Sequence, residues 1–118
     1  MHDDDAPLCR NAADVAALSG RRARLIGDYV EVDLRKDPVP PPEYRGRAGV
    51  RLEDGRVVML EPGWAEAGLR SEDERKRLAG KRVEAIGSVW VKPPKPPRPI
   101  AYPLAPCLAP VESVREAG

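Results

Sequence analysis

The chain has 118 residues, of which 33% are charged and 42% are apolar, and its formal net charge is +1. This length suits a single domain whose core needs neither a metal nor a disulfide. No apolar run approaches the roughly 18 residues of a membrane-spanning helix. The acidic start, MHDDDAPLCR, lacks the layout of a secretion signal, so we expect a cytoplasmic protein with no membrane partner. In that reducing compartment Cys9 and Cys107 are expected to be free thiols, and a disulfide between them is the alternative.

The first predicted element is a short helix over residues 11–18. Asn11 is a suitable N-cap, and Ser19-Gly20 is a suitable end. The apolar side chains of this segment are small, so we expect the helix to pack on the body of the protein as a lid.

A long strand is predicted over residues 22–34, with a glycine in its middle. Ala23 and Leu25 alternate with arginines before Gly27, whereas the apolar positions after it have the opposite parity. That later set comprises Val30, Val32 and Leu34. Both sets face inward only if the strand gains a residue, and a glycine is the usual place for such a bulge. We therefore predict a bulge at Gly27-Asp28 that bends the strand around two sides of a small barrel.

A β-hairpin is predicted in residues 48–60, AGVRLEDGRVVML, with Asp54-Gly55 as a two-residue turn. With this turn Val50 faces Met59 and Leu52 faces Val57, and these four side chains share the core face. The outer face is then predicted to carry Tyr29, Glu31, Asp33, Arg51, Glu53 and Val58.

The second half of the chain predicts one helix and two strands. Ser71 and Glu74 form a capping box for a helix that ends near Ala79. Leu69 and Leu78 are expected to point at the core. In a strand over residues 82–91, the predicted inward set is Val83, Ala85, Gly87, Val89 and Val91, and the predicted outward residues are Ile86 and Trp90. The last strand covers residues 107–114, where Pro110 indicates an edge or a bulge.

This order of elements resembles the OB-fold, the oligonucleotide/oligosaccharide-binding fold. The local segments that support the resemblance are Leu25-Ile26-Gly27, Leu52-Glu53-Asp54-Gly55, and Gly80-Lys81-Arg82-Val83 before Ile86-Gly87. The resemblance implies an all-β protein with one or two short helices: a five-stranded Greek-key barrel with a helix between strands three and four. The predicted organisation is an acidic N-terminal segment (1–20), the barrel (21–115) and a tail (116–118). The implied binding surface is the face of strands two and three with the loops beside it, and the ligand is left open.

Signals for catalysis are weak. His2 is the only histidine, and no serine lies in a Gly-x-Ser-x-Gly elbow. Two distant cysteines and one histidine fall short of a tetrahedral metal site, and Asp3-Asp4-Asp5 is typical of a solvated tail. We expect a binding module without catalytic activity, cofactor, metal or small-molecule substrate.

Two proline-rich loops, residues 37–46 and 92–106, are the predicted binding surface. They interleave basic and aromatic side chains, and single-stranded nucleic acid requires both, because cations neutralise phosphates and rings stack on bases. The predicted contact residues are Arg45, Arg47, Arg51, Lys92, Lys95, Arg98, Tyr44, Trp90 and Tyr102. The outer sheet face mixes acids with bases, and Gln and Thr are absent from the chain. This composition favours backbone-driven, sequence-tolerant binding.

The same loops also suit a protein-interaction module that docks through the prolines, Trp90 and Val58. Residues 93–98, PPKPPR, fit a PxxPxR ligand of SH3-type domains, although a stiff polyproline spacer has the same composition. Basic residues are also what a soluble loop requires, and Trp90 could equally cover the helix or the N-terminal segment. The expected partner is therefore single-stranded nucleic acid or a protein.

Overall fold

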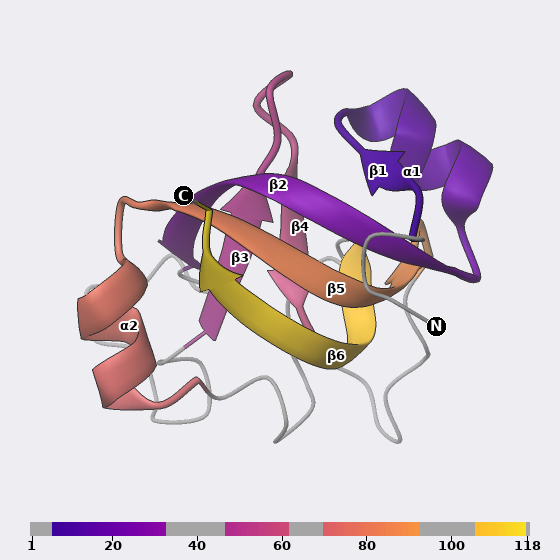
Figure 1. Ribbon diagram of the computed structural model, residues 1–118. Coiled ribbons are helices and arrows are strands. Elements are labelled where there is room, and N and C mark those ends of the chain that lie inside the picture. Colours follow the sequence, from indigo (N-terminus) through magenta and orange to yellow (C-terminus); the bar gives the residue numbers. More distant parts are fainter. Residues whose placement is uncertain (1–5, 33–46, 62–69, 93–105, 118) are drawn as a thin grey trace, which may run out of the picture.

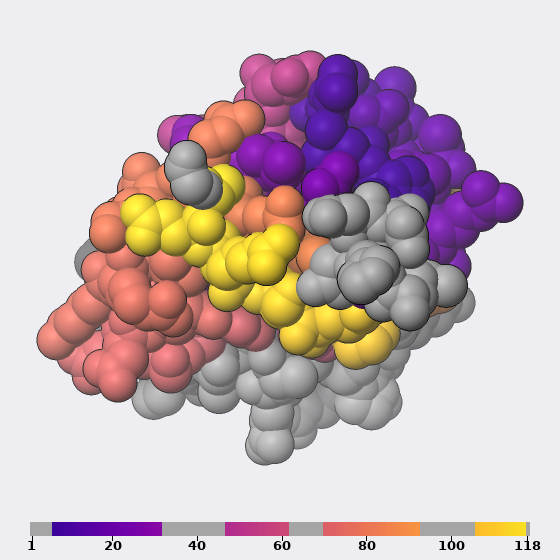
Figure 2. Space-filling view, in the orientation of Figure 1, coloured from indigo at the N-terminus to yellow at the C-terminus, as the bar shows by residue number. Residues whose placement is uncertain are grey.

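The computed structural model describes residues 6–32, 47–61, 70–92 and 106–117, which form one sheet and two short helices (Figure 1). The elements are β1 (Leu8–Cys9), α1 (Ala12–Leu18), β2 (Arg21–Val32), β3 (Arg47–Arg51), β4 (Val57–Leu60), α2 (Glu72–Leu78), β5 (Arg82–Trp90) and β6 (Cys107–Glu116). In the space-filling view of Figure 2, β6 crosses the face between α2 at the lower left and the N-terminal segment at the upper right.

Strands β2 to β6 close into a five-stranded barrel. β2 pairs with β5 from Arg21 to Asp28 and with β3 from Asp28 to Val32, both antiparallel. The pairs β3–β4, β4–β6 and β6–β5 complete the ring. α2 lies between the third and fourth barrel strands in chain order. The predicted fold class is therefore confirmed, and the arrangement is compatible with an OB-like fold.

The predicted bulge at Gly27-Asp28 is wrong. β2 keeps one register with β5 through Gly27 and one register with β3 from Asp28, so its inward parity does not change. Tyr29 rather than Val30 continues the inward set, and it is fully buried in the core. The predicted exposure of Tyr29 on the outer face is therefore also wrong. Asp33, Leu34 and Leu69, which were placed from the sequence, lie outside the described residues.

Gly27 instead permits a close approach of two backbones. A Cβ atom at this position would collide with the carbonyl oxygen of Arg51. β3 begins to pair with β2 at the next residue, Asp28, which faces Arg51. The missing side chain therefore allows β3 to meet β2 without a change of register.

The β3–β4 hairpin has a three-residue turn instead of the predicted two-residue turn. Val50 faces Val58, which leaves residues 53–55 in the loop. The N–H of Gly55 donates to the carbonyl of Leu52 over 2.9 Å, and Gly55 has a φ of +86°. This is a β-turn followed by a left-handed glycine.

The extra loop residue turns β4 over, because a shift of one residue moves every side chain to the other face. Val58 and Leu60 lie in the core cluster, whereas Val57 and the buried Met59 do not belong to it. The predicted inward position of Val57 and the predicted exposed position of Val58 are wrong, whereas Met59 is buried, as predicted, but outside this cluster.

One apolar cluster fills the barrel and includes side chains from both helices. Val15 of α1 and Leu78 of α2 are buried in it, as expected for a lid and for an inward-pointing helix residue. Figure 1 shows the two helices at opposite ends of the barrel. Each helix therefore covers one end of the same core.

The predicted alternation of β5 is mostly confirmed. The core members from β5 are Val83, Ala85 and Val89. Ile86, which was predicted outside, is fully buried. Val91, which was predicted inside, follows the end of β5 and is 42% exposed. The register of β5 with β6 shifts on both sides of Gly87, opposite the segment that contains Pro110, as the proline indicates.

The N-terminal segment adds a strand that the sequence pattern does not show. β1 pairs in parallel with β2, and Cys9 is fully buried there. Asn11 is the N-cap of α1, as predicted. The carboxylate of Asp54, at the hairpin turn, accepts hydrogen bonds from the backbone N–H of Ala12 (2.8 Å) and of Arg56 (3.0 Å). The bond from Ala12 ties the segment to the tip of the β3–β4 hairpin, and the bond from Arg56 lies within the hairpin.

Both cysteines are free and buried. Burial raises the pKa of Cys9 to about 11 and that of Cys107 to about 12. Both thiols are therefore protonated at neutral pH and are poor nucleophiles.

A buried polar contact holds α2 against β2. Ser71 caps α2 as predicted, and the Glu74 N–H donates to its Oγ over 3.1 Å. The Glu74 carboxylate accepts hydrogen bonds from the Tyr29 hydroxyl (2.8 Å) and from two guanidinium nitrogens of Arg70 (2.6 and 2.7 Å). Burial raises the pKa of Glu74, but these hydrogen bonds outweigh it, and the pKa lies below its ordinary value.

We expect Gly27→Ala to lower the free energy of unfolding by about 2 kcal/mol, because the new methyl group meets backbone atoms that cannot rotate away. Urea titration measures this loss. The matched control is Gly55→Asn, at a left-handed position with open space around it, which should cost less than about 1 kcal/mol. A Gly27→Ala variant as stable as the wild type would contradict the role given to Gly27.

We expect Tyr29→Phe to cost about 1 kcal/mol at neutral pH, because it removes one hydrogen bond and leaves Glu74 paired with Arg70. The lowered pKa of Glu74 means that the folded protein binds fewer protons there than the unfolded chain. This stabilisation is complete above the ordinary pKa of glutamate and is lost as the pH falls through the lowered pKa. In urea titrations, the gap between wild type and variant should therefore shrink below about pH 4. A difference in stability that does not change with pH would contradict the role given to the Tyr29–Glu74 hydrogen bond.

Candidate functional site

Four of the nine predicted contact residues lie in the described part of the chain, namely Arg47, Arg51, Trp90 and Lys92. The other five lie outside it: Tyr44, Arg45, Lys95, Arg98 and Tyr102. Arg51 and Lys92 are exposed and open to a ligand. The structure therefore describes only part of the predicted surface.

Arg47 and Trp90 are less accessible than predicted. Arg47 faces away from the core, because Ala48 and Val50 face inward, yet it is only 3% exposed. The Trp90 indole N–H donates to the carbonyl of Ala109 over 2.7 Å, and its ring lies beside Gly20. This placement fits the alternative in which Trp90 covers the N-terminal segment.

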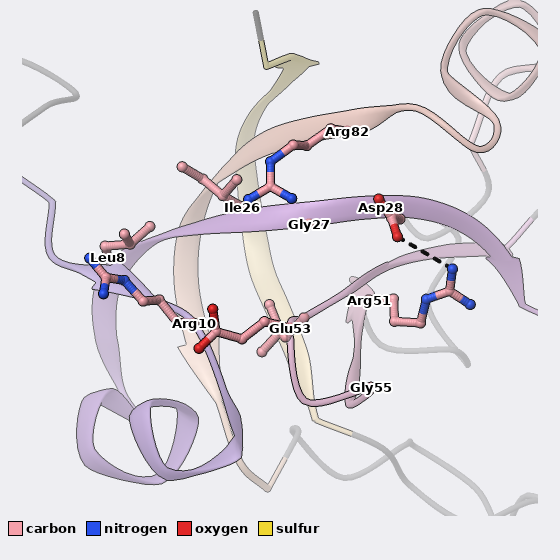
Figure 3. A pocket seen from close by; sticks show the side chains of 10 residues that line it. Leu8, Arg10, Ile26, Gly27, Asp28, Arg51, Glu53, Gly55 and Arg82 are labelled. Atoms are coloured by element: carbon pink, nitrogen blue, oxygen red, sulfur yellow. Dashed lines mark hydrogen bonds and ion pairs between the residues drawn. The ribbon is translucent and has the colours of Figure 1, made fainter.

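The structure shows a cleft of about 300 Å³ at one edge of β2 (Figure 3). β5 occupies the other edge of β2 through Asp28, so β1 and β3 share this edge. β1 pairs with β2 as far as Leu25, and β3 begins at Asp28. The stretch Ile26-Gly27 lies between these two strands and lines the cleft. The cleft therefore occupies the interval between β1 and β3.

Three arginines from three separate parts of the chain line this cleft. Arg10 follows β1, Arg51 ends β3, and Arg82 begins β5. Arg82 faces away from the core, because the next residue, Val83, faces inward. Figure 3 shows its guanidinium lying over β2 at Ile26. Basic residues that lie far apart in the sequence thus line one cleft.

The charges in the cleft are only partly neutralised. Arg51 Nη2 lies 3.3 Å from Asp28 Oδ2, and both side chains are about half exposed (52% and 45%). Exposed pairs of this kind contribute little, so Arg51 can exchange partners. The side chains of Arg10, Arg82 and Glu53 make no ion pair or hydrogen bond with a residue that the structure describes. With respect to the described residues, the cleft therefore presents free guanidinium groups beside one free carboxylate.

Arg10, Arg82 and Glu53 are site residues that sequence reasoning missed. The outward position of Arg82 follows from the predicted alternation of its strand and could have been found in that way. Nothing local marks Arg10, because β1 has two residues and shows no periodicity. Glu53 was placed on the outer sheet face, and the three-residue turn places it at the cleft.

In the described ranges, no group of three His, Cys, Asp or Glu side chains could hold a metal ion, and no helix is long and apolar enough to span a membrane. Comparisons of the chain with protein-family models, with curated proteins and with solved structures found no match. The chemistry of the cleft is therefore the basis for assigning a function.

Proposed function

We propose that this chain is a non-catalytic module that binds single-stranded nucleic acid through its phosphates. The observation that carries the proposal is that Arg10, Arg51 and Arg82 line one cleft. A guanidinium group binds phosphate oxygens through paired hydrogen bonds. Two of these three arginines have no acidic partner among the described residues, so their charge is available to a ligand.

The cleft shares one residue with the predicted binding surface. Arg51 belongs both to the predicted set and to the cleft. In the two proline-rich loops, Arg45, Lys95 and Arg98 remain predicted phosphate contacts. Tyr44 and Tyr102 remain the predicted stacking residues. Because phosphate contacts carry no base information, this binding tolerates any sequence.

The alternative, a protein-interaction module, loses one of its expected contact residues. Val58 is fully buried, and Trp90 is half-buried with its indole N–H already bonded. The prolines of residues 93–99 lie outside the described residues. Docking through that loop therefore stays a second proposal, and the next experiment separates it from the first.

We expect a labelled dT oligomer to bind the wild type at ~50 mM salt and to be released as the salt rises. The double variant Arg10→Ala/Arg82→Ala should bind about tenfold more weakly. It should also flatten the slope of log K against log salt by about 1.4, because two phosphate contacts are lost. Fluorescence anisotropy measures both quantities.

The matched control is Lys76→Ala/Arg77→Ala, which removes the same charge from α2, away from the residues that line the cleft. It should change the affinity less than about twofold, as expected for loss of net charge alone. An equal loss in the two double variants would contradict a role for the cleft. If the wild type binds no oligomer at ~50 mM salt, nucleic-acid binding is excluded. A partner captured from lysate through the prolines of residues 93–99 would then favour the protein-interaction module.

A further inference from the structure

Glu53 is a free carboxylate in a cleft whose other free charged side chains are arginines. It is exposed and makes no ion pair or side-chain hydrogen bond with any residue that the structure describes. Its backbone N–H donates to the carbonyl of Arg10 over 3.3 Å, so it lies beside the N-terminal segment. Figure 3 shows the side chain extending from the hairpin toward β1.

A carboxylate at this position opposes the binding of a phosphate, because like charges repel. Asp28 does not raise the same difficulty as long as Arg51 stays paired with it, and in the structure Arg51 Nη2 lies 3.3 Å from Asp28 Oδ2. Glu53 has no such partner in the part of the chain that the structure describes. Its presence is compatible with nucleic-acid binding if the ligand offers it a hydrogen-bond donor, because an ionised carboxylate only accepts.

The donor must be present on every nucleotide if binding tolerates any sequence. Amino groups occur on some bases and are absent from others. The ribose 2′-hydroxyl occurs on every nucleotide of RNA and on none of DNA, and it can donate a hydrogen bond. The 2′-hydroxyl of RNA is therefore a better hydrogen-bond donor for Glu53 than any group of a base, if binding tolerates any sequence.

The remaining surface of the cleft suits one nucleotide. Its volume of about 300 Å³ is at the lower end of small-ligand sites. Leu8, Ile26 and Leu52 give it apolar surface. Such surface can accept the face of a base or a sugar without selecting a base.

We propose that the cleft is a ribonucleotide subsite in which Arg10 and Arg82 bind the phosphate and Glu53 accepts a hydrogen bond from the 2′-hydroxyl. This proposal rests on the proposed function and narrows it, because the strand bound would be RNA in preference to DNA.

The test compares oligomers of U, dU and 2′-O-methyl-U of equal length, by anisotropy at ~50 mM salt. The wild type should bind the U oligomer about fivefold more tightly than the dU oligomer, as expected for one net hydrogen bond. The 2′-O-methyl oligomer should bind like dU, because it keeps the oxygen but lacks the donor. Glu53→Ala should bring the ratio of U to dU affinity to about one. The control Asp73→Ala, which removes an exposed carboxylate from α2, should leave that ratio unchanged.

Equal binding of U and dU oligomers to the wild type would overturn the subsite, as would a preference that survives Glu53→Ala. Tight binding of the 2′-O-methyl oligomer would assign the preference to sugar pucker and would also overturn it. In these cases the oligomers still bind, so the proposed function is untouched. Failure of the wild type to bind any oligomer is instead the failure of that function.

Competition with 5′-UMP distinguishes an RNA strand from a free nucleotide as the ligand of the cleft. Displacement of the oligomer by 5′-UMP at the oligomer's own concentration would contradict an RNA strand as the ligand.

Discussion

The structure depends on one strand, β2, that serves two sides of the barrel. β2 has 12 residues and passes from β5 to β3 at Asp28, which pairs with both neighbours. A bulge would be one way to make this transition, but the protein uses a close backbone approach at Gly27. Because β3 joins β2 only at Asp28 and β1 leaves it after Leu25, two residues of the β2 edge are left between them. The cleft is therefore a consequence of how the barrel closes.

The second constraint is a polar contact across the core. Tyr29 lies in the apolar cluster, and its hydroxyl is satisfied by Glu74 of α2. A buried phenol needs such a partner, because an unbonded hydroxyl in an apolar environment is costly. The backbone of Tyr29 also pairs with Gly80 and Lys81 on the loop that leads from α2 into β5. One residue of β2 thus positions both the helix and the start of the next strand, where Arg82 lies.

The sequence pattern correctly predicted features that are fixed by hydrogen bonds between residues close in sequence. It failed where contacts between residues far apart in the sequence fix the structure. The caps at Asn11 and Ser71 were found, because each is a side chain bonded to a backbone N–H three residues away. Asp54-Gly55 identified the hairpin, but a left-handed glycine fits a two-residue and a three-residue turn equally well. The choice between them reversed the faces of β4. The burial of Tyr29 depends on Glu74, 45 residues away, which no periodicity reveals. At the site, Arg51 was predicted from its strand, whereas Arg10 required a parallel pairing of two residues.

The cleft also links the N-terminal segment to the barrel. Arg10 holds its place through the pairing of β1, through its carbonyl, which accepts from the Glu53 N–H, and through its N–H, which donates to Asp14 over 2.9 Å. Arg82 belongs to β5, on the opposite edge of β2. A phosphate held by both arginines would therefore bridge from the segment across β2 to the far neighbour strand. Docking of the segment and binding of such a ligand are then linked. The free energy by which the ligand stabilises the docked segment equals the free energy that docking of the segment adds to ligand binding. The buried Cys9 and Val15, which anchor the segment in the core, would therefore contribute to the affinity for such a ligand without touching it.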